Sequence, residues 1–148
     1  MGWAAAAMLL LGSCAQNATP AASAQTETVQ AKNANLLAGN WRLVRLNGQT
    51  VTVAEAARTP QLSFQVAEQR VTGYTGCNRL TGGAIVSNTH ISFQGVASTR
   101  MACIGEALEQ PFLAALSEAT LVYQVTQTQL TLLKEGQPVL EFERAPQE

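Results

Sequence analysis

Hydrophobic side chains recur at every second position in several short runs between residues 61 and 143, for example at Leu62, Phe64 and Val66. Successive side chains of a strand point to opposite faces, so this alternation buries one face and leaves the other in solvent, as in antiparallel sheets. A first strand is expected to begin near Gly39 and to end at the tight-turn pair Asn47-Gly48. The runs that we expect to form the later strands are residues 61–66, 70–74, 90–95, 121–125, 129–133 and 139–143.

A different spacing, with steps of three and four residues, predicts one helix near residues 108–118. Pro111 has no backbone donor and is tolerated only in a first turn, which places the start of the helix close to Leu108. Its apolar face would pack on the sheet, with ligand binding as the alternative. We therefore predict a mainly β (α+β) fold, in which a strongly curved antiparallel sheet or partly open β-barrel packs against one helix. The residues of the apolar face are Leu108, Phe112, Ala115, Leu116 and Ala119.

The N-terminal residues show neither the alternation of a strand nor the three-to-four spacing of an amphipathic helix. MGWAAAAMLLLGSC holds an apolar stretch that is too short to cross a bilayer of about 30 Å, and residues 1–13 are typical of an export signal peptide. Its end, Leu11-Gly12-Ser13-Cys14, resembles the lipobox of bacterial lipoproteins, in which the leader is removed before the cysteine and Cys14 is then lipidated. No Lys or Arg precedes Lys32, so the usual cationic start is missing. The alternative is a buried apolar helix.

Residues 14–38 are expected to form a flexible tether behind the lipidated cysteine. After Cys14 this segment has no aromatic residue and only two charged ones, Glu27 and Lys32, so it cannot bury enough apolar surface to offset its ordering entropy. The folded domain would then cover residues 39–148. We expect a monomer in the bacterial cell envelope, lipid-anchored to the outer membrane and facing the periplasm.

Charge and composition exclude several classes of function. The nine Lys and Arg residues balance ten acidic residues without a basic cluster, which argues against nucleic acid as a partner. All ten acidic residues are glutamates, so an Asp-based triad, an Asp-led calcium loop and an aspartyl phosphoryl transfer are excluded. The glycines of VTGYTGCNRLTGG match no phosphate-binding pattern. Glu106 and Glu109 could form an acid/base pair, although a first helical turn favours acidic side chains without any substrate.

The cysteine within GCNRLTGG could be a nucleophile, a metal ligand or half of a disulfide. Cys77, His90 and Cys103 lack the spacing of a metal site, and we expect neither a metal nor a cofactor. A thiol-dependent enzyme using Cys77 and His90 would need both within hydrogen-bond reach, and it stays as an alternative. In an oxidising compartment thiols pair. If lipid takes Cys14, the disulfide joins Cys77 and Cys103; without lipidation three pairings are open.

The segments GYTGCNRLTGGAI and ISFQGVASTRMACIGEALEQPFLAAL, followed by LVYQV, LTLL and LEFE, resemble the META domain family, which includes the heat-shock lipoprotein HslJ. The resemblance covers about residues 39–144, and its opening Gly39-x-Trp41-x-Leu43 is similar to the usual first strand. The family implies a curved antiparallel sheet with one helix, similar to secretin pilotins, which are small lipoproteins that hold hydrophobic partners. The residues that carry the most specific motifs are Gly76, Cys77, Asn78, Thr99, Met101, Ala102 and Cys103.

The resemblance also implies roles for single residues. Asn78 tolerates left-handed backbone and would suit a tight bend with Gly76. Met101 is expected to pack beneath the loop. Thr99 is expected to form a hydrogen bond with the backbone of this loop. Arg100 is expected to be exposed or to contact a partner. No enzymatic activity is implied. We expect a binding module in envelope maintenance or stress response, and the alternative is a pilotin-like carrier of a lipid or hydrophobic peptide.

Overall fold

The computed structural model describes residues 33–53, 59–103, 108–117 and 120–146. The expected export signal, Cys14, most of the expected tether, Glu106 and Ala119 lie outside these residues. Within them, no helix is long and apolar enough to cross a membrane. The elements are β1 (Gly39–Leu46), β2 (Gln49–Thr50), β3 (Gln61–Gln65), the short 3-10 helix η2 (Val66–Glu68), β4 (Arg70–Tyr74), β5 (Arg79–Val86), β6 (His90–Ser98), α2 (Glu109–Leu116), β7 (Thr120–Val125), β8 (Gln129–Lys134) and β9 (Gln137–Arg144).

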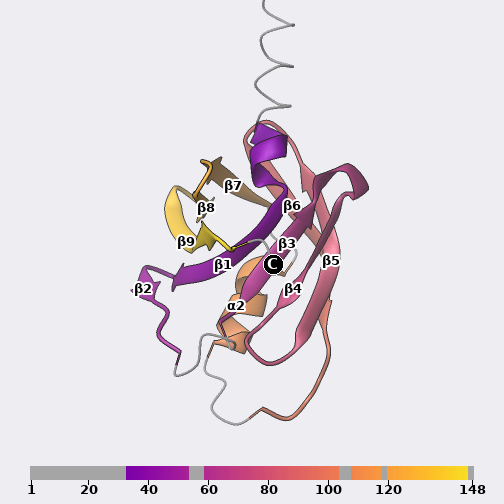
Figure 1. The fold of residues 1–148 in the computed structure, drawn as a ribbon, viewed down its shortest axis with the longest axis vertical. Coiled ribbons are helices and arrows are strands. Elements are labelled where there is room, and N and C mark those ends of the chain that lie inside the picture. The colour runs from indigo at the N-terminus through magenta and orange to yellow at the C-terminus, as the bar shows by residue number, and fades with distance from the viewer. Residues whose placement is uncertain (1–32, 54–58, 104–107, 118–119, 147–148) are drawn as a thin grey trace, which may run out of the picture.

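The nine strands form one antiparallel sheet that curves back on itself (Figure 1). Neighbours in sequence pair with one another from β3 to β9, and β1 pairs with both β3 and β9, which gives the sheet a ring-like arrangement. The predicted strongly curved antiparallel sheet is confirmed. The ring is weakest between β6 and β7, where only residues 90–92 of β6 pair with residues 120–122.

The core is formed by the alternating positions that the sequence indicates. Leu62 and Phe64 of β3, together with Ile91 and Phe93 of β6, are at most 2% exposed, and the rings of Phe64 and Phe93 contact each other with centroids 6.2 Å apart. Burial of such side chains from water is the main stabilising term of a fold of this size. The other fully buried hydrophobic side chains above alanine size in the described residues are Leu37, Trp41, Leu43, Val71, Phe112, Leu116, Leu121, Leu130, Leu132, Leu140 and Phe142.

Helix α2 is shorter than the expected span but presents the expected face. Phe112 and Leu116 are fully buried, and the Phe112 ring meets Phe142 of β9 in an edge-on contact with centroids 6.5 Å apart. Pro111 lies in the first turn, where a missing backbone donor costs nothing. The helix ends at Leu116 because Ser117 takes extended backbone. The Ser117 N–H and hydroxyl both donate to the Leu113 carbonyl and so cap the last turn. Phe112 and Leu116 therefore pack the buried face of the helix against the sheet.

The folded part begins earlier than residue 39, which corrects the C-terminal boundary of the predicted tether. Residues 33–37 are helical, and Leu37 is fully buried. Trp41 Nε1 donates to the Leu37 carbonyl at 2.8 Å, and the guanidinium of Arg144 donates to the carbonyls of Leu36 and Ala38. Contacts from β1 and β9 therefore hold this turn, although its own composition gives no reason to expect it.

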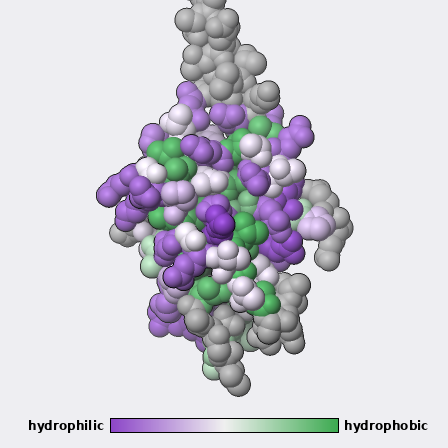
Figure 2. All heavy atoms as spheres, turned by 90° about the vertical axis from the view of Figure 1, so that its left-hand side faces the viewer, coloured by the Kyte–Doolittle hydropathy of each residue, from purple (hydrophilic) through white to green (hydrophobic). Residues whose placement is uncertain are grey.

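Polar side chains cover most of the face on the side of β2, β8 and β9, with small hydrophobic areas between them (Figure 2). Two ion pairs cross from β1 to β9 on the outer side of the sheet. Arg42 binds Glu143 through Nε and Nη2, and Arg45 Nη1 lies 3.8 Å from Glu141 Oε1. A surface with this mixture of charges is typical of a solvated face.

Candidate functional site

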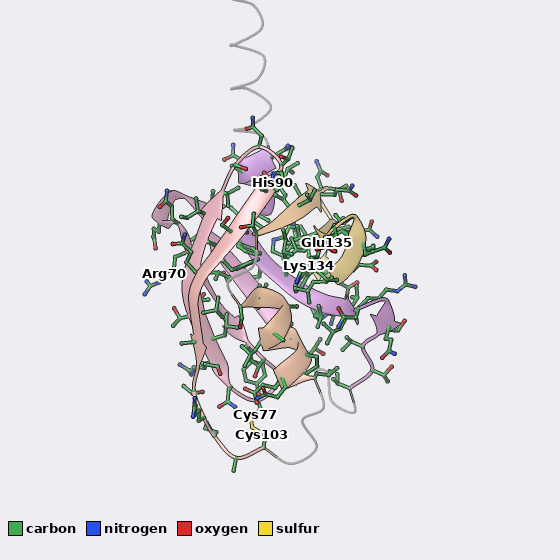
Figure 3. All side chains as sticks on the ribbon, turned by 180° about the vertical axis from the view of Figure 1, so that it is seen from behind. Arg70, Cys77, His90, Cys103, Lys134 and Glu135 are labelled. Carbon is green, nitrogen blue, oxygen red and sulfur yellow. A yellow bond between two sulfur atoms is a disulfide. The ribbon has the colours of Figure 1, made fainter. Side chains whose placement is uncertain are left out.

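A disulfide links two connections at one end of the molecule (Figure 3). Cys77 lies in the turn between β4 and β5, Cys103 lies in the loop that follows β6, and their Cα atoms are 6.1 Å apart. Both cysteines are half-buried. The bond joins positions 26 residues apart in sequence, so it ties the loop before α2 to the β4–β5 turn.

The β4–β5 turn is built around Thr75 and Asn78. The N–H of Thr75 donates to the Asn78 carbonyl at 2.8 Å, and the N–H of Asn78 donates back to Thr75 Oγ1 at 2.9 Å. Gly76 has φ +102°, a left-handed conformation that glycine adopts without steric cost. Both polar residues are buried, so these reciprocal bonds satisfy groups that water does not reach.

The Asn78 side chain connects three separate segments. Its Oδ1 accepts from the Thr99 hydroxyl and from the Met101 N–H, both at 2.8 Å. Its Nδ2 donates to Glu109 Oε1 at 2.9 Å and to Oε2 at 3.1 Å, and it lies 3.7 Å from Cys103 Sγ. With 2% exposure, the amide is a buried group whose acceptor and donor sides are both occupied.

Glu109 is the helical member of this group. It is the first residue of α2, and its Oε1 also accepts from the Thr75 hydroxyl at 3.1 Å. A carboxylate in the first turn is favoured by the helix dipole, so the same residue stabilises α2 and anchors it to the β4–β5 turn. We call the whole group the asparagine cluster; its members are Thr75, Cys77, Asn78, Thr99, Cys103 and Glu109.

Asn78 lies in the expected tight turn with Gly76, but the structure differs in detail from the roles expected for Asn78 and Met101. Asn78 is not among the residues with positive φ; it acts through its side-chain amide and not through a left-handed bend. Met101 is 68% exposed, because the bond from its N–H to Asn78 turns its backbone inward and its side chain outward. Thr99 does form the expected kind of hydrogen bond with the backbone, since its hydroxyl accepts from the Arg79 N–H at 3.1 Å. Arg100 and Ala102 are exposed.

The structure does not bring Cys77 and His90 together. His90 lies at the opposite end of the molecule (Figure 3), where its Nδ1 is 2.8 Å from Thr89 Oγ1. A Cys77–His90 dyad is therefore not formed. A different group does converge: the sulfurs of Cys77 and Cys103 and a carboxylate oxygen of Glu109 all lie within 4.8 Å of one another. Thiolates and a carboxylate are ligand types that zinc accepts, so the chemistry of this group depends on the oxidation state of the two sulfurs.

Beside the cluster, the outer face of β4, β5 and β6 forms an open groove of about 710 Å³. Its surface is mostly apolar, and Arg79 is the charged residue among those that line it. Gly73 in its floor lets two strands approach closely, since a Cβ there would lie 2.2 Å from the Gln61 carbonyl oxygen. The other side chains of the groove are Thr72, Tyr74, Leu80, Thr81, Ala97, Ser98 and Thr99.

A second, smaller concavity of about 430 Å³ lies beside α2, between the helix and strands β7 to β9. Polar and apolar groups contribute about equally to its surface, and Lys134 is among the residues that line it. A carrier of a lipid chain needs a predominantly apolar cavity. Of the two spaces, the groove on β4–β6 therefore has the better surface for a hydrophobic partner.

Thr75 and Glu109 are the cluster members that sequence reasoning did not place. Their partners lie far along the chain, since Glu109 is 34 residues from Thr75 and 31 from Asn78. The helix dipole predicts an acidic residue at the position of Glu109, but it does not predict the contacts of this side chain. The spacing Thr75-x-x-Asn78 could have indicated the role of Thr75, because Thr and Asn side chains commonly form hydrogen bonds with the backbone of a tight turn.

Comparisons with known proteins agree with this fold. The model of the META domain family matches residues 34–147, a range that includes Leu37 and therefore supports the earlier domain start. An NMR structure of a protein from Burkholderia xenovorans is similar with a TM-score of 0.60 and 26% identity, covering 78% of this chain and 88% of the other. A second NMR structure has a TM-score of 0.57 and 29% identity, with coverages of 74% and 91%. Among curated proteins, none matches. The chain belongs to the META domain family.

Proposed function

We propose that this protein is a lipid-anchored, non-enzymatic binding module of the bacterial cell envelope, held at the outer membrane and facing the periplasm. In this role it would serve envelope maintenance under stress. The observation that carries the proposal is the Cys77–Cys103 disulfide. Structural disulfides belong to oxidising compartments, and this bond uses two of the three cysteines, which leaves Cys14 of the lipobox-like sequence for lipid.

The groove on β4–β6 supports a binding role. Its volume of about 710 Å³ falls in the range of sites that hold ligands, but it is open along the outer face of the sheet. An open, mostly apolar groove with Arg79 as its charged member suits an extended hydrophobic segment of an envelope protein. The rigid floor of paired strands would hold such a segment without rearrangement.

A pilotin-like carrier of a lipid or hydrophobic peptide is the second candidate. The apolar surface of the same groove favours it, whereas the concavity beside α2, with its half-polar surface, does not. Native mass spectrometry combined with lipid extraction separates the two candidates. A lipid that copurifies in a fixed ratio would favour the carrier, and its reproducible absence would exclude it.

The anchor is tested by metabolic labelling with a radioactive fatty acid and by fractionation of the envelope. We expect label on the wild-type protein and none on the Cys14→Ser variant, which should leave the membrane fraction. An outer-membrane position further predicts that the labelled protein sediments with the outer membrane in a density gradient. Label that persists in Cys14→Ser would contradict the lipobox interpretation.

The groove is tested in a deletion strain under envelope stress. We expect Thr81→Lys, an exposed position in the groove, to fail in restoring growth while the protein accumulates normally. Gln129→Lys is the matched control, because this position is exposed on β8, away from the groove. Full restoration of growth by Thr81→Lys would show that the groove is not needed for function. It would leave the proposed lipid anchor unaffected.

A further inference from the structure

The asparagine cluster places three metal-binding side chains at one point. The sulfurs of Cys77 and Cys103 and one carboxylate oxygen of Glu109 lie within 4.8 Å of one another, and all three residues are half-buried. They come from the β4–β5 turn, the loop after β6 and the start of α2. While the disulfide is intact, neither sulfur carries the negative charge that a metal ion requires, and the site is closed to metals.

We propose that reduction of the Cys77–Cys103 disulfide creates a site for a thiolate-preferring divalent cation of the zinc class, with two thiolates and the Glu109 carboxylate as ligands. The reductant is a dithiol of the thiol:disulfide oxidoreductase class. It gives two electrons and two protons to the disulfide, which becomes two thiols, and is itself oxidised to a disulfide. The metal ion then displaces the two thiol protons into water and bonds both sulfurs.

The ligand set fits such an ion. Zinc takes Cys sulfur at about 2.3 Å and carboxylate oxygen at about 2.0–2.2 Å, and three protein ligands with water in the fourth position is a recurrent arrangement. Bringing both sulfurs of the reduced pair onto one ion needs a separation of about 3.8 Å, from tetrahedral geometry with these bond lengths. The two Cα atoms already lie 6.1 Å apart, so side-chain rotation supplies this change.

The surrounding hydrogen bonds orient the carboxylate before any ion arrives. Glu109 accepts from the Asn78 amide and the Thr75 hydroxyl, and the Asn78 amide is in turn fixed by Thr99 and the Met101 N–H. Partners of this kind hold metal ligands in place and increase affinity.

This site differs from the group of three soft ligands that the sequence contains. The sequence offered His90 as the third soft ligand, and His90 lies at the opposite end of the molecule (Figure 3). The third ligand is instead Glu109, whose place beside the cysteines follows from the packing of α2. The oxidised protein has no such site, so metal binding would report the redox state of the disulfide.

The test uses the full chain carrying Cys14→Ala, so that Cys77 and Cys103 are its only thiols. The protein is reduced with a phosphine under argon and titrated with Co²⁺, followed by thiolate charge-transfer and visible ligand-field absorption, and Zn²⁺ is then added. We expect one Co²⁺ per chain, displacement by Zn²⁺, and affinity at least 100-fold lower in the oxidised protein. Equal affinity in both redox states would overturn the proposal.

Variants assign the ligands. Glu109→Gln keeps the size of the side chain and should weaken Co²⁺ binding at least tenfold, whereas His90→Ala should change nothing. Circular dichroism checks that Glu109→Gln is folded; because this residue also anchors α2, Cys103→Ser provides a second variant that removes one sulfur and leaves the carboxylate. Unchanged charge-transfer intensity per ion in Cys103→Ser, or tight binding retained by a folded Glu109→Gln, would reject the three-ligand site.

Discussion

The side-chain amide of Asn78 donates to both carboxylate oxygens of Glu109, at 2.9 and 3.1 Å, and so joins the β4–β5 turn to the first residue of α2. The same amide accepts from the loop that carries Cys103. One buried side chain thus holds three segments that the backbone does not connect directly. The disulfide beside it joins two of the same segments covalently.

Asn78→Ala should lower the free energy of unfolding by about 3 kcal/mol, since each lost hydrogen bond costs about 1 kcal/mol and the buried partners are left unsatisfied. Asn78→Asp should cost more, because a second carboxylate would face Glu109. Urea denaturation followed by circular dichroism measures both. Asn40→Ala is the control: Asn40 is exposed, and its substitution should change stability by less than about 0.5 kcal/mol. Equal losses for Asn78→Ala and Asn40→Ala would contradict the connecting role of Asn78.

The disulfide should act mainly on the unfolded chain. Replacing both Cys77 and Cys103 by Ser in a Cys14→Ala background should cost about 3.5 kcal/mol, the loop-closure entropy for a separation of 26 residues. The far-ultraviolet spectrum should not change, because the sheet and the Asn78 bonds remain. Urea denaturation of the reduced Cys14→Ala protein should give the same stability as the double Ser variant. A loss of β-sheet signal in native buffer would show instead that the bond is required for the fold.

Arg144 is expected to fix the N-terminal turn. Its guanidinium carbon lies 4.1 Å from the centroid of the Trp41 ring, and its nitrogens donate to the carbonyls of Leu36, Ala38 and Gln127. Arg144→Ala should therefore cost about 2–3 kcal/mol, combining a cation–π contact with charged hydrogen bonds.

The matched control for Arg144 is Arg45, whose side chain is 53% exposed and whose ion pair with Glu141 is long, at 3.8 Å. Arg45→Ala should cost less than about 0.5 kcal/mol. Hydrogen exchange adds a local measurement: amides of residues 36–38 should exchange faster in Arg144→Ala, while those of β5 keep their protection. Unchanged exchange at residues 36–38 would mean that the turn is held by Leu37 burial alone.

The fold followed from the sequence because its signals are local. Alternation within most strands and the three-to-four spacing around Phe112 depend on neighbours, and the structure has both. Strand β5 lies in the glycine-rich segment, which has no such alternation, and the sequence did not predict it. The domain boundary could not be predicted in the same way, since burial of Leu37 depends on Trp41 and on Arg144, over a hundred residues away. The contacts of Glu109 were hidden for the same reason: they arise when α2 packs against a turn formed 31 residues earlier.

Tyr123 should make the fold sensitive to alkali. Burial raises the pKa of its hydroxyl above the ordinary value of 10.0, and the hydroxyl donates to the Ser87 carbonyl at 3.0 Å. The folded protein therefore keeps this proton at a pH where the unfolded chain has begun to lose it. The stabilisation is fully present below pH 10 and is lost as the pH rises through the raised pKa of the folded state.

Absorbance at 295 nm measures this titration directly, and Tyr74→Phe leaves Tyr123 as the only tyrosine in the chain. We expect the folded Tyr74→Phe protein to ionise at higher pH than the same protein in urea. Tyr123→Phe should remove this contribution to the fall in stability above pH 10, as followed by urea denaturation at successive pH values. If the Tyr123 hydroxyl titrates at the same pH in the folded and unfolded states, water reaches it in the folded protein. Its hydrogen bond to Ser87 then contributes nothing to the change of stability at alkaline pH.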